Sequence, residues 1–270
     1  MLILSIFTLG CQGSRKIDPF QEALQKSDSG DYTGAIAELE ELQTTNPSSR
    51  VKIALASAYA ARGGLVIANF WEFVKAMRGP AVTADNLQTQ PFYVHNEKNL
   101  DVIAAIIPAD TKQNIDQLLL SMAAMQVYRE RLGLYPYIKK DGRGDLSRAV
   151  DVLGTTADPG ARIYRVIVNS VIVRSELDDG FNFWNSVDNQ FQDLLQHPLE
   201  FGRILCSPVT GSLTDWLSHQ FDRAKLISAD LAISFPSQAV QYTTLAEPVQ
   251  VYQARLPELQ LKLIPQGCPQ

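Results

Sequence analysis

The chain has 270 residues and a mass of 29.9 kDa, with 46% hydrophobic and 20% charged residues. This apolar share is enough for a folded core, and the length fits one large helical domain or two small ones. The formal net charge of −5 argues against nucleic-acid binding, which needs a basic stripe. The composition therefore predicts a neutral-to-acidic globular protein without a nucleic-acid partner.

The sequence opens with an apolar, uncharged stretch, residues 1–10, which Cys11 and a polar segment follow. This stretch is too short to cross a bilayer, because a spanning helix needs about 20 residues. A small residue and a cysteine after an apolar stretch resemble the end of a bacterial lipoprotein signal peptide, although Thr8 stands where these peptides usually carry leucine. The resemblance implies a signal segment at residues 1–10 and a lipidated Cys11. The alternative is a buried apolar segment with an incidental cysteine.

Lipidation of Cys11 would place the protein on a membrane. Each buried CH₂ of an acyl chain adds about 0.8 kcal/mol, so several chains anchor firmly. The lipoprotein resemblance further implies an outer-membrane location, because Gln12 rather than an aspartate follows the cysteine. We therefore expect a protein of the bacterial cell envelope, on the periplasmic face and anchored by lipid.

Two further cysteines, Cys206 and Cys268, are a candidate disulfide. In the periplasm a bonded pair is favoured over two free thiols. The bridge would close a loop of about 60 residues and stabilise the fold by roughly 4 kcal/mol. Two separately buried thiols are the alternative. No Cys-x-x-Cys and no cysteine–histidine pairing has the spacing of a zinc site, so we expect no metal.

The first helical patterns lie between residues 17 and 45. Phe20, Ala23 and Leu24 have the spacing of one helical face, and a second helix is predicted from Tyr32 to Thr45. Asn46-Pro47 should end it, since proline cannot continue a helix. A third helical pattern follows and ends at a glycine turn.

These helices carry residues at the signature positions of the tetratricopeptide repeat. They are Gly30, Ala35, Leu39, Leu42 and Pro47, followed by Leu55, Ala56, Tyr59 and Gly63. The chain therefore resembles this family over about residues 17–73. The resemblance implies an all-α fold of diverged antiparallel helical hairpins, in which small residues such as Ala35 allow close helix packing. Leu39 and Leu42 replace an aromatic and a small residue of the family pattern. A generic helical hairpin is the alternative.

Residues 78–94 contain glycine and prolines and predict a long loop. Long loops are uncommon unless they are functional or flexible. The loop and its end supply the candidate binding residues Phe92, Tyr93 and His95. An irregular crossover packed on the helices is the alternative.

Further helices are predicted along the rest of the chain. Asp158-Pro159 is a good helix start, although the β-branched residues of 163–177 also allow a strand. Prolines and alternating leucines predict an extended C-terminal tail. The predicted helices span residues 96–107, 111–134, 145–153, 163–177, 181–196 and 212–234, with Ser212 as an N-cap. The predicted divisions are residues 11–77 for the repeat-like hairpins, 78–236 for a continuing bundle of the same domain, and 237–270 for the tail.

Catalytic motifs are absent from the sequence. The histidines His95, His197 and His219 are isolated, and no nucleophile elbow, phosphate-binding glycine loop or metalloprotease motif occurs. Neighbouring carboxylates such as Glu40-Glu41 face different sides of a helix and do not form an acid–base pair. We therefore expect no enzyme, no catalytic residue and no cofactor.

Two binding functions remain, beside a structural envelope lipoprotein with no discrete ligand. The first is a lipid-anchored periplasmic scaffold that binds a protein or peptide partner in the cell envelope. The second is a small-ligand-binding or transport accessory lipoprotein, resembling the tetratricopeptide subunits of solute transporters. A deep apolar pocket would favour the ligand, and a broad groove would favour the protein partner.

Overall fold

The structure is a computed structural model. It describes residues 18–65, 83–103, 109–131, 140–155, 157–196 and 208–240, together with residues 243 and 254. Every element in this part of the chain is a helix, so the predicted all-α class is confirmed. The α-helices are α1 (Pro19–Asp28), α2 (Tyr32–Thr45), α3 (Ser49–Arg62), α5 (Ala84–Gln88), α6 (Pro91–Ile103), α7 (Ala109–Arg131), α8 (Arg143–Leu153), α9 (Pro159–Gln196) and α11 (Pro208–Ser234); short 3₁₀ turns are η2 (Lys140–Gly142) and η4 (Pro236–Gln238).

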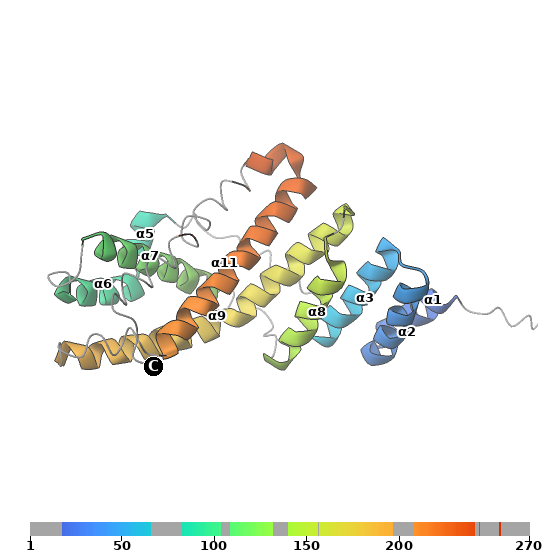
Figure 1. The fold of residues 1–270 in the computed structure, drawn as a ribbon, viewed down its shortest axis with the longest axis horizontal. Helices are drawn as coiled ribbons and strands as arrows, with labels where there is room; N and C mark the ends of the chain where they lie inside the picture. The colour runs from blue at the N-terminus through green and yellow to red at the C-terminus, as the bar shows by residue number, and fades with distance from the viewer. Residues whose placement is uncertain are drawn as a thin grey trace, which may run out of the picture.

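Helices α1, α2, α3, α8 and the first half of α9 lie side by side and form the first region (Figure 1). Each packs mainly on its neighbours in this order. Ala35 and Ala56 are fully buried, and their small side chains let the helix axes approach closely. Leu39 and Leu55 fill the space beside them and are 0% and 1% exposed. This core is apolar and reaches along α9 to Ile172.

Side-chain caps fix the starts of these helices. The Asp31 carboxylate accepts a hydrogen bond from the Gly34 backbone N–H at 3.0 Å, and Ser48 caps α3 in the same way. Asp158 accepts from the Ala161 N–H at 2.9 Å, so the predicted helix start at Asp158-Pro159 is confirmed. Residues 163–177 are helical rather than a strand because this cap and the apolar contacts of α9 with the first core outweigh β propensity.

Helix α8, although distant in sequence, is the direct neighbour of α3. A Cβ atom on Gly142 would lie 2.3 Å from the Gly63 carbonyl oxygen, so the two glycine backbones touch. Arg62 of α3 donates two hydrogen bonds to the Asp145 carboxylate, at 2.8 and 2.7 Å. The α3–α8 hairpin is therefore interrupted by a long insertion that leaves it after Gly63 and returns at Gly142.

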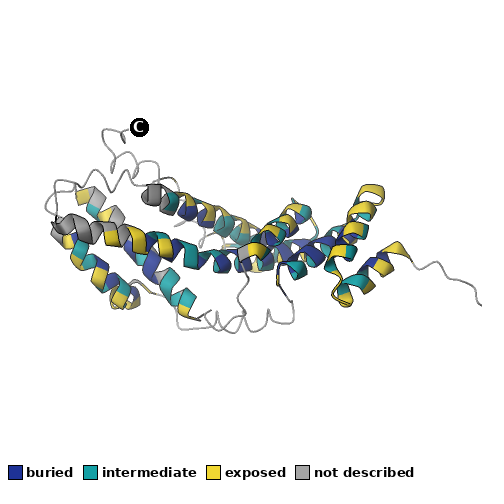
Figure 2. Cartoon of the chain, turned by 90° about the horizontal axis from the view of Figure 1, so that it is seen from below, coloured by how far each residue is buried: buried dark blue, intermediate teal, exposed yellow. Residues whose placement is uncertain are grey.

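The second region is built from this insertion. Helices α5, α6 and α7 pack with the second half of α9 and the first half of α11 around a separate apolar core. Tyr93, Leu119, Met122 and Leu217 are its largest almost fully buried residues, and Phe181 also contributes. Buried residues follow the facing sides of the helices, whereas the outward sides are exposed (Figure 2). Helix α9 runs through both regions as one helix of 38 residues, so the predicted break between residues 177 and 181 is wrong.

The predicted loop at residues 78–94 is partly wrong. Residues 84–88 form α5, and α6 begins at Pro91, five residues before the predicted helix. Thr83 caps α5, and proline suits the first turn of a helix because its missing N–H would be unpaired there. Residues 66–82 lie outside the described part of the chain.

Two predictions near the C-terminus also need correction. Helix α11 begins at Pro208, so Ser212 lies inside the helix and is not its N-cap. The described residues of the predicted extended tail are helical: η4 follows α11, and the Thr243 hydroxyl donates to the carbonyls of Ala239 and Val240. Pro236 starts this turn because its fixed φ suits a helical first turn.

Candidate functional site

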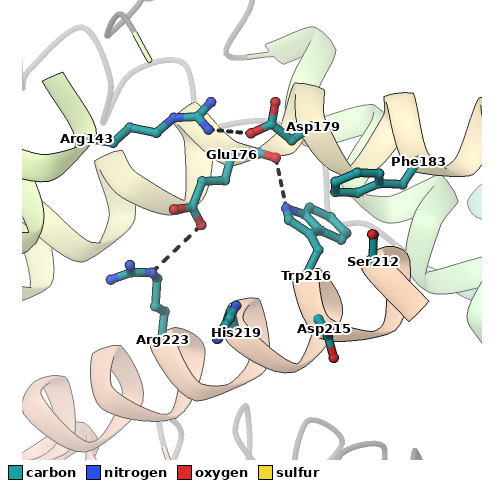
Figure 3. Close-up of a pocket in the computed structure, with 9 residues that line it drawn as sticks. All are labelled: Arg143, Glu176, Asp179, Phe183, Ser212, Asp215, Trp216, His219 and Arg223. Atoms are coloured by element: carbon teal, nitrogen blue, oxygen red, sulfur yellow. Dashed lines mark hydrogen bonds and ion pairs between the residues drawn. The ribbon is translucent and has the colours of Figure 1, made fainter. Parts of the chain in front are cut away.

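A cleft of about 430 Å³ lies between α9 and α11, where the first and second regions meet. Helix α9 supplies Glu176, Asp179 and Phe183, and Arg143 comes from the start of α8 (Figure 3). Helix α11 supplies the remaining lining residues, which are Ser212, Asp215, Trp216, His219 and Arg223. Their spacing of three and four residues places all five on one side of this helix.

Trp216 forms a fixed aromatic wall of the cleft. Its indole N–H donates to the Glu176 carbonyl oxygen at 2.9 Å (Figure 3). Gly180 lies directly beneath the ring, since a Cβ atom there would come within 2.3 Å of it. A glycine inside a helix weakens it by about 1 kcal/mol relative to alanine. Here the glycine allows Trp216 to pack against the α9 backbone, where it is only 7% exposed.

Arg143 joins α8 to the cleft. Its guanidinium donates to the Asp179 carboxylate (Figure 3). It also donates to the Ser175 carbonyl oxygen. Its side chain is 14% exposed, and a carboxylate partner reduces the cost of burying this charge. The pair therefore connects the first region to the polar wall of the cleft.

A second charged group forms the inner side of the cleft. The Glu176 carboxylate accepts from the Gln220 amide at 2.6 Å and lies 3.9 Å from Arg223 Nε. Arg223 also donates to the Asn169 side-chain oxygen at 3.2 Å. Asn169 is fully buried and Gln220 is 3% exposed. Polar side chains thus replace apolar packing between α9 and α11 at this point.

The same polar contact continues beyond the cleft. Arg165 donates two hydrogen bonds to Asp230, at 2.6 and 2.5 Å, and both residues are buried. Arg162 lies 3.5 Å from the same carboxylate. Bidentate guanidinium–carboxylate pairs have a defined geometry, so this pair fixes the position of α11 along α9. We call these contacts, from Arg165–Asp230 to Glu176–Gln220, the polar seam.

The structure places the predicted binding residues away from this cleft. Tyr93 is 2% exposed in the second core, and its hydroxyl donates to Asp116. Burial, together with the Asp116 carboxylate, raises the pKa of Tyr93. Phe92 packs against Phe181 and Trp184, with ring centroids 6.0 and 5.6 Å apart. His95 is exposed on α6.

Tyr93 is therefore a core residue, because its ring completes the apolar packing of the insertion.

The three cysteines, Cys11, Cys206 and Cys268, lie outside the described residues. Within the described ranges, no group of histidine, cysteine and carboxylate residues could hold a metal ion, and no helix is long and apolar enough to cross a membrane.

The cleft combines charged and aromatic groups. Ser212 and His219 are seven residues apart on one helix, which separates their backbones by about 10 Å along its axis, whereas a nucleophile and its base need direct hydrogen-bond contact. The described lining residues can hold a ligand through an aromatic wall, paired charges and exposed polar groups at the rim.

Sequence reasoning did not identify the cleft residues. The apolar pattern of residues 212–234 predicts Trp216 as a core residue, and no motif singles out Phe183 or Arg223. Gly144-Asp145 with Ala149 has the same residue spacing as Gly30-Asp31 with Ala35. The likeness is one of sequence only, because Gly30 and Asp31 precede α2 whereas Gly144 and Asp145 lie inside α8.

Comparison with known proteins found no similar sequence or fold: no family model, no curated protein and no solved structure matches this chain.

Proposed function

We propose that the protein is a lipid-anchored helical scaffold of the bacterial cell envelope that binds a protein or peptide partner in the α9–α11 cleft. The observation that carries this proposal is the composition of the cleft. A fixed tryptophan and two arginines line it, and Asp215 and His219 are exposed at its rim. Tryptophan and arginine are enriched among the residues that dominate protein–protein binding energy.

The alternative, a small-ligand-binding accessory protein, is supported only by the cleft volume. About 430 Å³ lies within the range of small-molecule pockets, but such pockets are mostly apolar and enclose their ligand. Five of the nine lining side chains here are charged. An open, charged cleft suits a partner that brings its own polar groups, so the protein partner is favoured.

The expected lipid anchor completes the proposal, because it would hold the scaffold at the membrane where its partner lies. The apolar stretch before Cys11 supports it. Fractionation of cells that carry Cys11→Ser tests this part. We expect the variant in the soluble periplasmic fraction; a variant that stays with the membrane would contradict the anchor.

Site-specific cross-linking in intact cells tests the binding site. A photo-reactive amino acid in place of His219, at the exposed rim, should cross-link the partner to the cleft. The matched control replaces Glu41, which is exposed on α2 in the first region. We expect a discrete product from position 219 that Trp216→Ala abolishes, and none from position 41. Equal products from both positions, or none from position 219, would contradict the proposed site.

A further inference from the structure

The outward face of α11 carries a regular stripe of exposed residues. Between residues 215 and 234, the exposed positions of this helix are Asp215, His219, Asp222, Leu226, Ala229 and Ile233. Their spacing alternates between four and three residues, which is the a/d spacing of the seven-residue repeat in helices that pack in a coiled coil.

The second half of the stripe is apolar. Leu226 is 46% exposed and Ile233 is 55% exposed, and Ala229 lies between them. The outward face of a surface helix is normally polar. Four of the five large apolar side chains exposed in the described residues belong to residues 226–240, so exposed apolar surface is concentrated here rather than scattered.

The first half of the stripe is polar and runs into the cleft. Asp215 and His219 belong to both the stripe and the cleft lining. Asp222 adds a second carboxylate one step further along. A partner that follows the stripe therefore meets apolar side chains at one end and carboxylates at the cleft.

A second copy of the chain fits this pattern poorly. An antiparallel pair centred on Ala229 would match only the three apolar residues of each copy. Stable interfaces use about 20–30 residues on each side. The partner must therefore also engage the polar half of the stripe and the cleft.

We propose that α11 docks an amphipathic helix of a partner protein, with apolar residues against Leu226 and Ile233 and with lysine or arginine residues at the end that reaches Asp215. This inference rests on the proposed function, because it names the kind of partner that enters the cleft. Heptad packing supplies the contact along the stripe, and charge complementarity sets which end of the partner helix lies at the cleft.

Synthetic helical peptides of three heptads test the inference. Two heptads carry leucine at the core positions, and the third carries lysine or, in the control peptide, glutamate. Binding to the full chain is measured by fluorescence anisotropy. We expect the lysine peptide to bind and the double variant Leu226→Ser/Ile233→Ser to bind it about tenfold more weakly, because two half-exposed apolar side chains are lost. The matched control is Ile163→Ser, an apolar residue 38% exposed on α9, which should leave binding unchanged.

A charge exchange tests the direction of the partner helix. Asp215→Lys should weaken the lysine peptide by about threefold, the size expected for one exposed ion pair, and strengthen the glutamate peptide. Equal binding of both peptides, or equal losses in Ile163→Ser and the double variant, would overturn the inference. So would a concentration-dependent dimer that the double variant abolishes. A cross-link from position 219 that the double variant leaves intact would reject the docked helix but retain the proposed function.

Discussion

The two regions of the molecule are held together in different ways. In the first region the buried residues of α1, α2, α3 and α8 are apolar, and small residues set the helix spacing. The second region also has an apolar core, but α11 continues beyond it along the first half of α9, where the polar seam joins the two helices. Five of the six buried polar residues in the described ranges, including Arg165, Gln220 and Asp230, belong to these two helices.

This difference separates the packing that stabilises the fold from the ion pairs that position the binding surface. Apolar packing supplies free energy in proportion to buried area and is non-directional. Buried ion pairs contribute little net stability but have defined geometry, and they are strongly destabilising when one partner is removed. The first region therefore suits a rigid support. The seam fixes α11 in one position, with its cleft and its exposed stripe facing outward.

The largest expected effect follows from breaking the seam. Asp230→Asn should lower the free energy of unfolding by about 3–5 kcal/mol, because it leaves the buried Arg165 guanidinium without its carboxylate. Urea denaturation measures the loss. The matched control, Asp222→Asn, removes an exposed carboxylate on the same helix and should change stability little. Similar losses in both variants would show that the seam is not what fixes α11.

Truncating a core residue of the first region, Leu39→Ala, should lower the free energy of unfolding by about 3 kcal/mol. Leu39 is 0% exposed between α1, α2 and α3, and replacing a buried leucine by alanine leaves a cavity. Urea denaturation of Leu39→Ala measures this loss. Because the cleft lies elsewhere, the cross-link from position 219 should persist in the folded variant. Its disappearance would contradict the separation of support from binding.

A smaller loss of stability is expected when Gly180, which lies beneath the Trp216 ring, is replaced by alanine. Gly180→Ala should destabilise by about 2 kcal/mol, because its Cβ forces the Trp216 ring away from α9. A shift in tryptophan fluorescence and weaker cross-linking at the cleft should accompany the loss. Gly144→Ala is the control: nothing lies within 4 Å of its Cβ, so it should be neutral or slightly stabilising. An unchanged fluorescence spectrum in Gly180→Ala would place the indole elsewhere.

The smallest effect concerns the ion pair between α3 and α8. The Arg62 guanidinium lowers the pKa of Asp145 below its ordinary value of 3.8. A carboxyl group with a lower pKa in the folded state stabilises the protein above its unfolded pKa, and this contribution is lost as pH falls through the folded value. Asp145→Asn should therefore lower the free energy of unfolding by about 1 kcal/mol at pH 7. The difference from wild type should shrink as the pH falls below about 4 and disappear only below the lowered pKa of the folded state; a difference independent of pH would contradict this origin.

The fold class and several helix limits could be predicted because local signals determine them. Tyr32–Thr45 is bounded by Asp31 and Asn46-Pro47, and its predicted limits agree with those of α2. The cap at Asp158 likewise identified the start of α9. Such signals lie within a few residues of the helix end that they determine.

The cleft could not be predicted, because its residues meet only through tertiary packing. Arg143 reaches Asp179 only because the chain returns at Gly142 to lie beside Gly63. Gly180 resembles an ordinary helix interruption until Trp216 is seen to pack on it. The burial of Tyr93 could not be predicted for the same reason, since the packing of α6 and α7 causes it.

Hydrogen exchange of the full chain, alone and with the partner captured from position 219, tests the central claim most directly. If α11 and the cleft bind the partner, backbone amides in α11 and around Glu176–Phe183 should gain protection. The amides of α1, α2 and α3 should exchange as before. Protection gained in those three helices, with α11 unchanged, would contradict the assignment of support and binding to the two regions.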